Sequence, residues 1–202
     1  MISKLPQTCD EFKSMVMEVK HSQGLPFVLA LYQVMDELSA LARPSIQPPL
    51  ACCATCSFCC HQMVTCTKME WRVIHEYLIG NGLLRKLVQR LRAGVERWLK
   101  YYSSNRGALE QNPFKLHADH KGQACIYLNQ KGCCDIYPVR PMDCRIWVST
   151  IKCGPGVTSG ARRAIHPWEE WANSWLLEEN ARSTNQGKSV TPLPHWLATI
   201  KF

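Results

Sequence analysis

Clustered cysteine thiols are the side chains of this sequence best placed to do chemistry. The chain has 202 residues and twelve cysteines, and its densest group is Cys53-x-x-Cys56-x-x-Cys59-Cys60. Two residues between thiols let both sulfurs reach one ion while the intervening backbone points N–H groups at them. Thiolates are the soft ligands preferred by zinc and by iron–sulfur clusters. The group therefore predicts a metal site.

A second set of cysteines follows in the other half of the chain with wider spacing. Its members are Cys125, Cys133, Cys134, Cys144 and Cys153. Because one zinc ion takes about four ligands, the two sets suffice for two mononuclear sites or for one shared polynuclear site. Side chains of neighbouring residues tend to diverge, most strongly in extended backbone. We therefore expect Cys59 and Cys60 to face different ions, or one of them to bridge two ions or stay free.

The composition favours thiols over disulfides. Cysteine makes up about 6% of the chain, below the roughly 8–10% of short disulfide scaffolds. The first residues contain no continuous apolar stretch of the kind found in a secretory signal. No run of residues approaches the roughly 18 apolar residues of a membrane-spanning helix. We therefore expect a cytoplasmic protein without a membrane partner, in which clustered thiols bind metal or do redox chemistry.

The net charge of the chain gives only weak support to a nucleic-acid partner. The formal charge is +8. Eight thiolates bound to two divalent ions would add −8 and +4, which leaves a net charge of about +4. A basic charge alone predicts nonspecific attraction to anions.

Two arginines and a histidine lie next to the cysteines in sequence. Arg140 and Arg145 flank Cys144, and His61 directly follows Cys60. A guanidinium group can neutralise part of the charge of several thiolates and donate hydrogen bonds to sulfur, and an imidazole can bind metal or donate to a ligand. We expect these three side chains to surround the metal ligands. The alternative for the arginines is pairing with Asp135, Asp143 or a helix end.

The cysteine motifs resemble a known family. The spacing Cys53-x-x-Cys56-x-x-Cys59-Cys60, then Cys125, then Cys134-Asp135-Ile136-Tyr137, then Arg140-Pro141-x-x-Cys144-Arg145, is similar to that of the YkgJ-type cysteine-cluster family of zinc- or iron-chelating domains. The resemblance covers about half of the chain. It implies zinc or iron as the cofactor, and a related segment in flagellin lysine methylases implies an iron–sulfur centre. The ligands that the resemblance implies are Cys53, Cys56, Cys59, Cys60, Cys125, Cys134 and Cys144.

The sequence departs from the family pattern in two places. An eighth family cysteine follows soon after the Cys-Arg pair, and the candidate here, Cys153, lies farther along the chain. The family's Cys-Pro-Phe-Leu is replaced by Cys125-Ile126-Tyr127-Leu128. Four further cysteines are extra to the pattern: Cys9, Cys52, Cys66 and Cys133.

Helices are expected to carry these loops. Apolar residues recur at three- and four-residue steps between Asp10 and Ser22, between Pro26 and Pro44, and from Leu83 to Tyr102. Thr67-Lys68-Met69-Glu70 has the spacing of a capping box and predicts a helix that Gly80-Asn81-Gly82 closes. A last helix is expected to start at Pro167.

Two stretches near the second set of cysteines predict other structure. Residues 124–128 and 134–137 are β-prone and separated by turn residues, which predicts a small β-hairpin. Residues 103–119 are polar and predict an irregular segment. The expected fold is mainly α: a helical scaffold with two cysteine-rich metal-binding loops and this hairpin. Its expected parts are an N-terminal helical segment (1–50), a cysteine-cluster metal-binding domain (51–155) and a Trp-rich helical segment (156–202) packed on the same domain.

The sequence thus predicts a metal-binding protein that holds zinc or an iron–sulfur cluster. Two alternatives remain open at this point. In the first, an iron centre serves a redox or protein-modifying enzyme. In the second, zinc organises a protein- or nucleic-acid-binding module, with the basic side chains of the helix that starts at Leu83 as one contact surface.

Overall fold

The protein is mainly helical, as the sequence predicts. The structure is a computed structural model that describes residues 2–52, 56–111, 114–120, 122–154, 166–185, 187 and 189–200. Its helices are α1 (Cys9–Gln23), α2 (Phe27–Ala42), α3 (Lys68–Gly80), α4 (Leu83–Gln111), α5 (Phe114–Asp119), α6 (Met142–Ile146), α7 (Pro167–Ser183) and α8 (Leu193–Leu197). Short 3₁₀ turns cover Arg43–Ser45, Phe58–Cys60 and Tyr137–Val139.

A two-stranded antiparallel sheet joins distant parts of the chain. Strand β1 (Thr65–Cys66) pairs with β2 (Thr191–Pro192), and Cys66 lies opposite Thr191. The hairpin predicted within residues 124–137 is reduced to a turn with one antiparallel bridge, between Leu128 and Cys134. The small sheet therefore lies elsewhere than the sequence indicates, because its second strand comes from the C-terminal end of the chain.

Local sequence signals explain where several helices begin and end. The Thr8 hydroxyl caps α1 by accepting from the Glu11 N–H at 3.2 Å, and Gly24 ends that helix with φ +64°. The predicted capping box at Thr67 and Glu70 is present at the start of α3. The prediction of an irregular segment at residues 103–119 is wrong, since helix α4 continues to Gln111 and helix α5 follows it.

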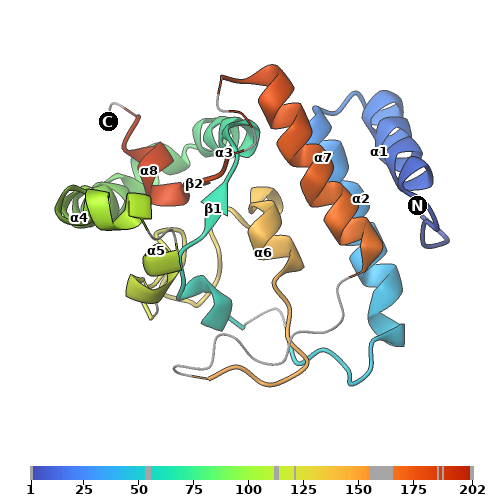
Figure 1. Cartoon of the computed structure of the whole chain (residues 1–202), viewed down its shortest axis with the longest axis horizontal. Coiled ribbons are helices and arrows are strands. Elements are labelled where there is room, and N and C mark those ends of the chain that lie inside the picture. The colour runs from blue at the N-terminus through green and yellow to red at the C-terminus, as the bar shows by residue number, and fades with distance from the viewer. Residues whose placement is uncertain are drawn as a thin grey trace.

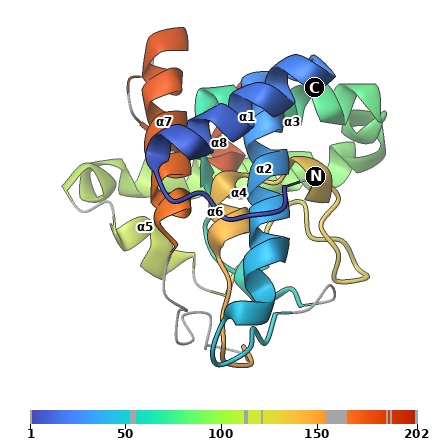
Figure 2. The same ribbon diagram turned by 90° about the vertical axis from the view of Figure 1, so that its right-hand side faces the viewer.

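One continuous apolar core joins the helices. Helices α1, α2, α3 and α7 pack together, with α1 crossing α2 in Figure 2, and we call these four helices the helical body. Helix α4 packs on α3, α5 and α8 on the other side of the sheet (Figure 1). Three tryptophans, Trp71, Trp98 and Trp168, are buried.

No single helix in the described residues is long and apolar enough to cross a membrane. The helices Cys9–Gln23 and Phe27–Ser45 meet that length and composition only as a pair, bent by 119°. Most of the apolar residues of α2 are instead buried in the core.

Candidate metal centre

A 3₁₀ turn positions the adjacent pair Cys59 and Cys60. The turn is closed by the Cys60 N–H, which donates to the Ser57 carbonyl at 2.9 Å, and by the His61 N–H, which donates to Phe58 at 3.1 Å. The thiols of Cys59 and Cys60 form a hydrogen bond with each other. The expectation that the two thiols face different ions, or that one of them bridges two ions or stays free, stays a prediction.

Backbone hydrogen bonds bring the second set of cysteines to this turn. The Cys125 N–H donates to the Cys60 carbonyl at 2.6 Å, and the Gly122 N–H donates to His61 at 2.8 Å. Cys134 comes after a turn that is closed by the antiparallel bridge between Leu128 and Cys134. Residues more than 60 positions apart in sequence thus lie side by side.

Cys144 comes from α6, which the helical body holds in place. The Met142 N–H donates to Glu70 Oε1 at 2.7 Å, and Thr65 Oγ1 donates to Asp143 Oδ2 at 2.6 Å. The loop predicted to carry Cys144 therefore ends in a short helix, which the strand β1 and the start of α3 fix from either side.

These thiols are close enough to affect one another's protonation. Burial raises the pKa of Cys144 well above its usual value, and the charges of Cys125, Asp143, Cys134 and Cys59 raise it further. Burial likewise raises the pKa of Cys125 to about 11, with a further contribution from Cys134. These cysteines are half-buried, and we call Cys59, Cys60, Cys125, Cys134 and Cys144 together the buried thiol group.

Within this group, the pKa values of Cys59 and Cys60 shift in opposite directions. The hydrogen bond from Cys60 lowers the pKa of Cys59 to about 7, and the positive charge of Arg140 contributes in the same direction. Cys60, which gives that hydrogen bond, has its pKa raised. One thiol of this pair therefore ionises more readily than an isolated cysteine, and an ionised thiolate is the form that binds metal.

The sulfurs of the buried thiol group do not yet form a coordination shell. Among the described residues, no three side chains of the types His, Cys, Asp or Glu converge closely enough to hold a metal ion. The donor set fits a soft metal by its chemistry, since it consists of clustered thiols with a guanidinium beside them. Coordination would draw the sulfurs together from the three segments that carry them.

Three further thiols surround a separate cavity of about 210 Å³. Cys52, Cys56 and Cys153 line it together with Phe58 and Ile151, among others. Cys52, which lies outside the family pattern, accepts from the Ser149 N–H at 3.2 Å. We call these three the outer thiols. The predicted ligand Cys53 lies outside the described residues.

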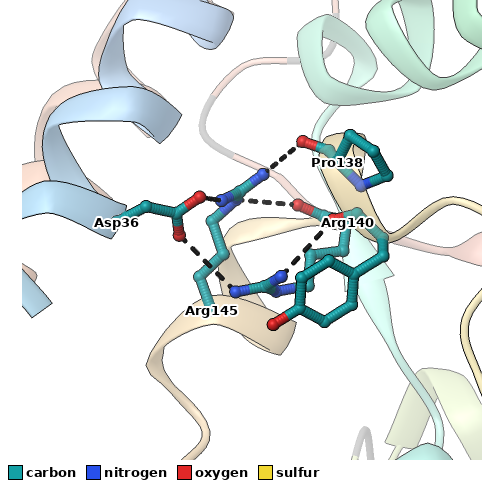
Figure 3. Close-up of polar contacts among 5 residues, drawn as sticks. Asp36, Pro138, Arg140 and Arg145 are labelled. Carbon is teal, nitrogen blue, oxygen red and sulfur yellow. Dashed lines mark hydrogen bonds and ion pairs between the residues drawn. The ribbon is translucent and has the colours of Figure 1, made fainter. Parts of the chain in front are cut away.

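Figure 3 shows how Arg140 and Arg145 meet one carboxylate on α2. Both guanidinium groups pair with Asp36, Arg140 at 3.5 Å. Arg145 also donates to the carbonyls of Pro138, at 2.7 Å, and Arg140, at 3.1 Å, and its side chain is 2% exposed. Arg145 therefore holds the loop before Cys144 in shape.

Arg140 is the arginine that lies near the thiols. Its guanidinium lies over the Tyr137 ring, 3.9 Å from the centroid. Its charge contributes to the lowered pKa of Cys59 and partly offsets the burial that raises the pKa of Cys134. The position of Arg140 is therefore compatible with the predicted role beside the metal ligands. The predicted alternative partners of the arginines bind elsewhere, because Asp135 pairs with Arg90 and Asp143 accepts from Thr65.

The remaining predicted residue, His61, lies at the edge of the buried thiol group. Its Nδ1 is 3.0 Å from the Ser57 carbonyl oxygen. This contact fixes the ring on the 3₁₀ turn that carries Cys59 and Cys60.

Sequence reasoning missed three residues that shape this region. Asp36 holds both arginines, Glu70 anchors α6, and Arg90 of α4 pairs with Asp135 beside the thiols. Glu70 was visible only as a helix-capping residue. The sequence places Arg90 only among the basic side chains of the helix that starts at Leu83, whereas in the structure it pairs with Asp135, next to Cys134. Asp36 has no signal in the sequence.

Comparison of the chain with models of known families, with curated proteins and with solved structures gave no match. The likeness to the YkgJ-type family therefore rests on the cysteine spacings alone.

Proposed function

We propose that this protein binds zinc or an iron–sulfur cluster through the thiolates of Cys59, Cys60, Cys125, Cys134 and Cys144. The observation that carries the proposal is the convergence of these cysteines from three separate segments onto one partly buried region. Isolated structural cysteines have no reason to collect in this way, whereas soft metal ions require such a set.

The charges around the buried thiol group support the same function. Several thiolates bring a large negative charge that a metal ion only partly neutralises. Arg140 lies beside Cys59 and Cys134, and Arg90 lies beside Cys125. These cations would stabilise the thiolate form that a metal needs, and the metal would supply either a structural crosslink or a redox centre.

The outer thiols give the protein a further set of ligands. Cys56 and Cys153 belong to the predicted ligand set, and Cys52 lies with them around the second cavity. In this proposal the buried thiol group is the principal site. The outer thiols complete it, or hold a second ion, when the loops close.

The test begins with metal content and an absorption spectrum of protein purified without oxygen. Zinc without visible absorption would assign closed thiolate sites. Iron with acid-labile sulfide and visible absorption would assign a cluster. Absence of any metal, with all thiols free to react with a thiol reagent, would overturn the proposal.

Neighbouring cysteines supply a matched pair of variants. Cys134 belongs to the buried thiol group, whereas the Cys133 side chain is exposed and contacts the Lys131 carbonyl at 3.8 Å. We expect Cys134→Ser to lower the metal content per chain by about half or more, because one lost ligand typically weakens a four-ligand site severely. Cys133→Ser and Cys9→Ser should leave it unchanged. Equal metal content in Cys134→Ser, Cys144→Ser and these controls would contradict the ligand assignment.

A further inference from the structure

Another cavity, distinct from that of the outer thiols, is lined in part by Cys125. Its volume is about 170 Å³, and it lies between α4, residues 123–126 and the start of α8. Its walls include the apolar side chains Met63, Val64, Ile126 and Leu193, with the ring of Trp98. The proposed metal chemistry makes no use of this space.

The size and the walls of the cavity suit one aromatic ring. An apolar cavity of about 150 Å³ in another protein is large enough to bind benzene. This cavity is of similar volume and has an aromatic side chain on one wall, where a ring can make offset or edge-to-face contacts.

The walls are held in place before any ligand arrives. Trp98 Nε1 donates to His195 Nδ1 at 3.4 Å, and Tyr101 donates to Asp119 at 2.8 Å. The His120 ring packs edge-on against Tyr101, with centroids 4.4 Å apart. Because these rings have fixed orientations, a ligand would lose little affinity to ordering them.

Arg97 places a positive charge at this cavity. Arg97 lines it, and among the described residues Arg97 makes no hydrogen bond or ion pair. Its guanidinium reaches back along α4, since Nη2 is 4.0 Å from the point where a Cβ on Gly94 would lie. That same Cβ would lie 2.5 Å from Ile126 Cγ2, so the glycine lets the loop with Cys125 close against the helix.

We propose that this cavity binds a small aromatic carboxylate, with its ring against Trp98 and Ile126 and its carboxylate on Arg97. Arginine offers a planar pair of donors that matches a carboxylate. Gln62 and Gln123 also line the cavity and can hydrogen-bond the same group. The bound molecule would lie next to Cys125, at the edge of the buried thiol group.

The experiment uses benzoate as the probe and benzyl alcohol as its neutral counterpart. Proton–nitrogen correlation NMR spectra of the full chain would monitor the indole N–H signals of the seven tryptophans. The signal that is missing from the spectrum of the Trp98→Phe variant is that of Trp98. We expect saturable shifts of the Trp98 signal with benzoate and about tenfold weaker binding of benzyl alcohol, the size of one charge-assisted hydrogen bond.

Two arginine variants on the same helix decide the role of the charge. Arg97→Gln should remove the preference for benzoate over benzyl alcohol, whereas Arg85→Gln, also an exposed arginine of α4, should keep it. No saturable shift of the Trp98 signal, or an unchanged preference in Arg97→Gln, would overturn the proposal. The chain alone forms the cavity, so chelator-treated protein should bind benzoate too. Failure of metal binding and failure of this site are therefore separate results.

Discussion

The helical body and the region that carries the thiols are held together by different forces. In the body, Phe12, Leu31, Leu38 and Ile74 are completely buried, and each belongs to the continuous core. Such burial contributes about 1.5–3 kcal/mol per large side chain. The body is thus stabilised by apolar packing that needs no ion.

The thiol region, by which we mean residues 56–66 and 122–153, has little regular structure. Its shape depends on backbone hydrogen bonds such as Cys125 to Cys60, and on ion pairs such as Arg90 with Asp135 and Arg145 with Asp36. The contrast teaches that the body depends on apolar packing, whereas the thiol region adds ionic contacts to the apolar side chains, such as Tyr127 and Ile136, that it contributes to the shared core. The final arrangement of the sulfurs depends on charges and, in our proposal, on a metal.

The largest expected effect tests the body. Leu38→Ala removes a completely buried side chain from α2, and we expect it to lower the free energy of unfolding by about 3 kcal/mol. Denaturant unfolding measures this change. Leu99→Ala on α4, where the side chain is 47% exposed, should change stability by less than about 0.5 kcal/mol.

The metal content of the folded Leu38→Ala protein sharpens the comparison. We expect it to equal that of the unchanged protein, because the folded variant keeps the hydrogen bonds that hold the proposed ligand segments in place. A proportional loss of metal would show that the two regions are not separable.

An intermediate effect tests the ionic contacts. Asp36→Asn removes the carboxylate that both arginines share and leaves the buried Arg145 without a counter-charge. Asp36 is half exposed, so we expect a loss of about 1 kcal/mol, between the values for surface and buried pairs. Arg182→Gln, which breaks an exposed pair with Glu179, is the control and should cost less than about 0.5 kcal/mol.

The smallest effect is a pH dependence at the boundary between α4 and α8. Burial lowers the pKa of His195, whose ring accepts from Trp98. The unfolded chain therefore binds this proton more readily, and stability should be full above the ordinary histidine pKa of about 6.5 and decrease as the pH falls below it. Thermal unfolding at several pH values measures this slope. His195→Gln should flatten it, and His21→Gln, at an exposed position, should not.

Much of the helical body could be predicted from the sequence because its signals are local. The capping box at Thr67 and the glycine after α1 act within a few residues of the helices that they bound. The apolar period of α2 likewise specifies its buried face. For α4, the polar residues after Tyr102 concealed the continuing helix, since helix propensity and packing on α5 and α8 outweigh a weak apolar pattern.

The thiol region could be predicted only in part because its contacts are non-local. The sequence identified the cysteines by type and spacing, and five of those predicted as ligands lie together. It could not identify Asp36 as the partner of Arg140 and Arg145, which lie more than 100 residues away. Nor could spacing show that Cys52 lies with Cys56 and Cys153, since that grouping depends on the backbone contact of Ala51 with Ser149.

The carboxylate of Glu70 has a consequence for how the chain folds. The carboxylate accepts from the N–H and the hydroxyl of Thr67, three residues away, and these bonds can form as soon as α3 does. Its other partners are Tyr32, 38 residues earlier, and Met142, 72 residues later. Closing contacts over such separations is slow compared with forming a helix. We therefore expect the carboxylate to remain hydrated during early folding, until α2, α3 and the segment with Cys144 enclose it in one late, cooperative step.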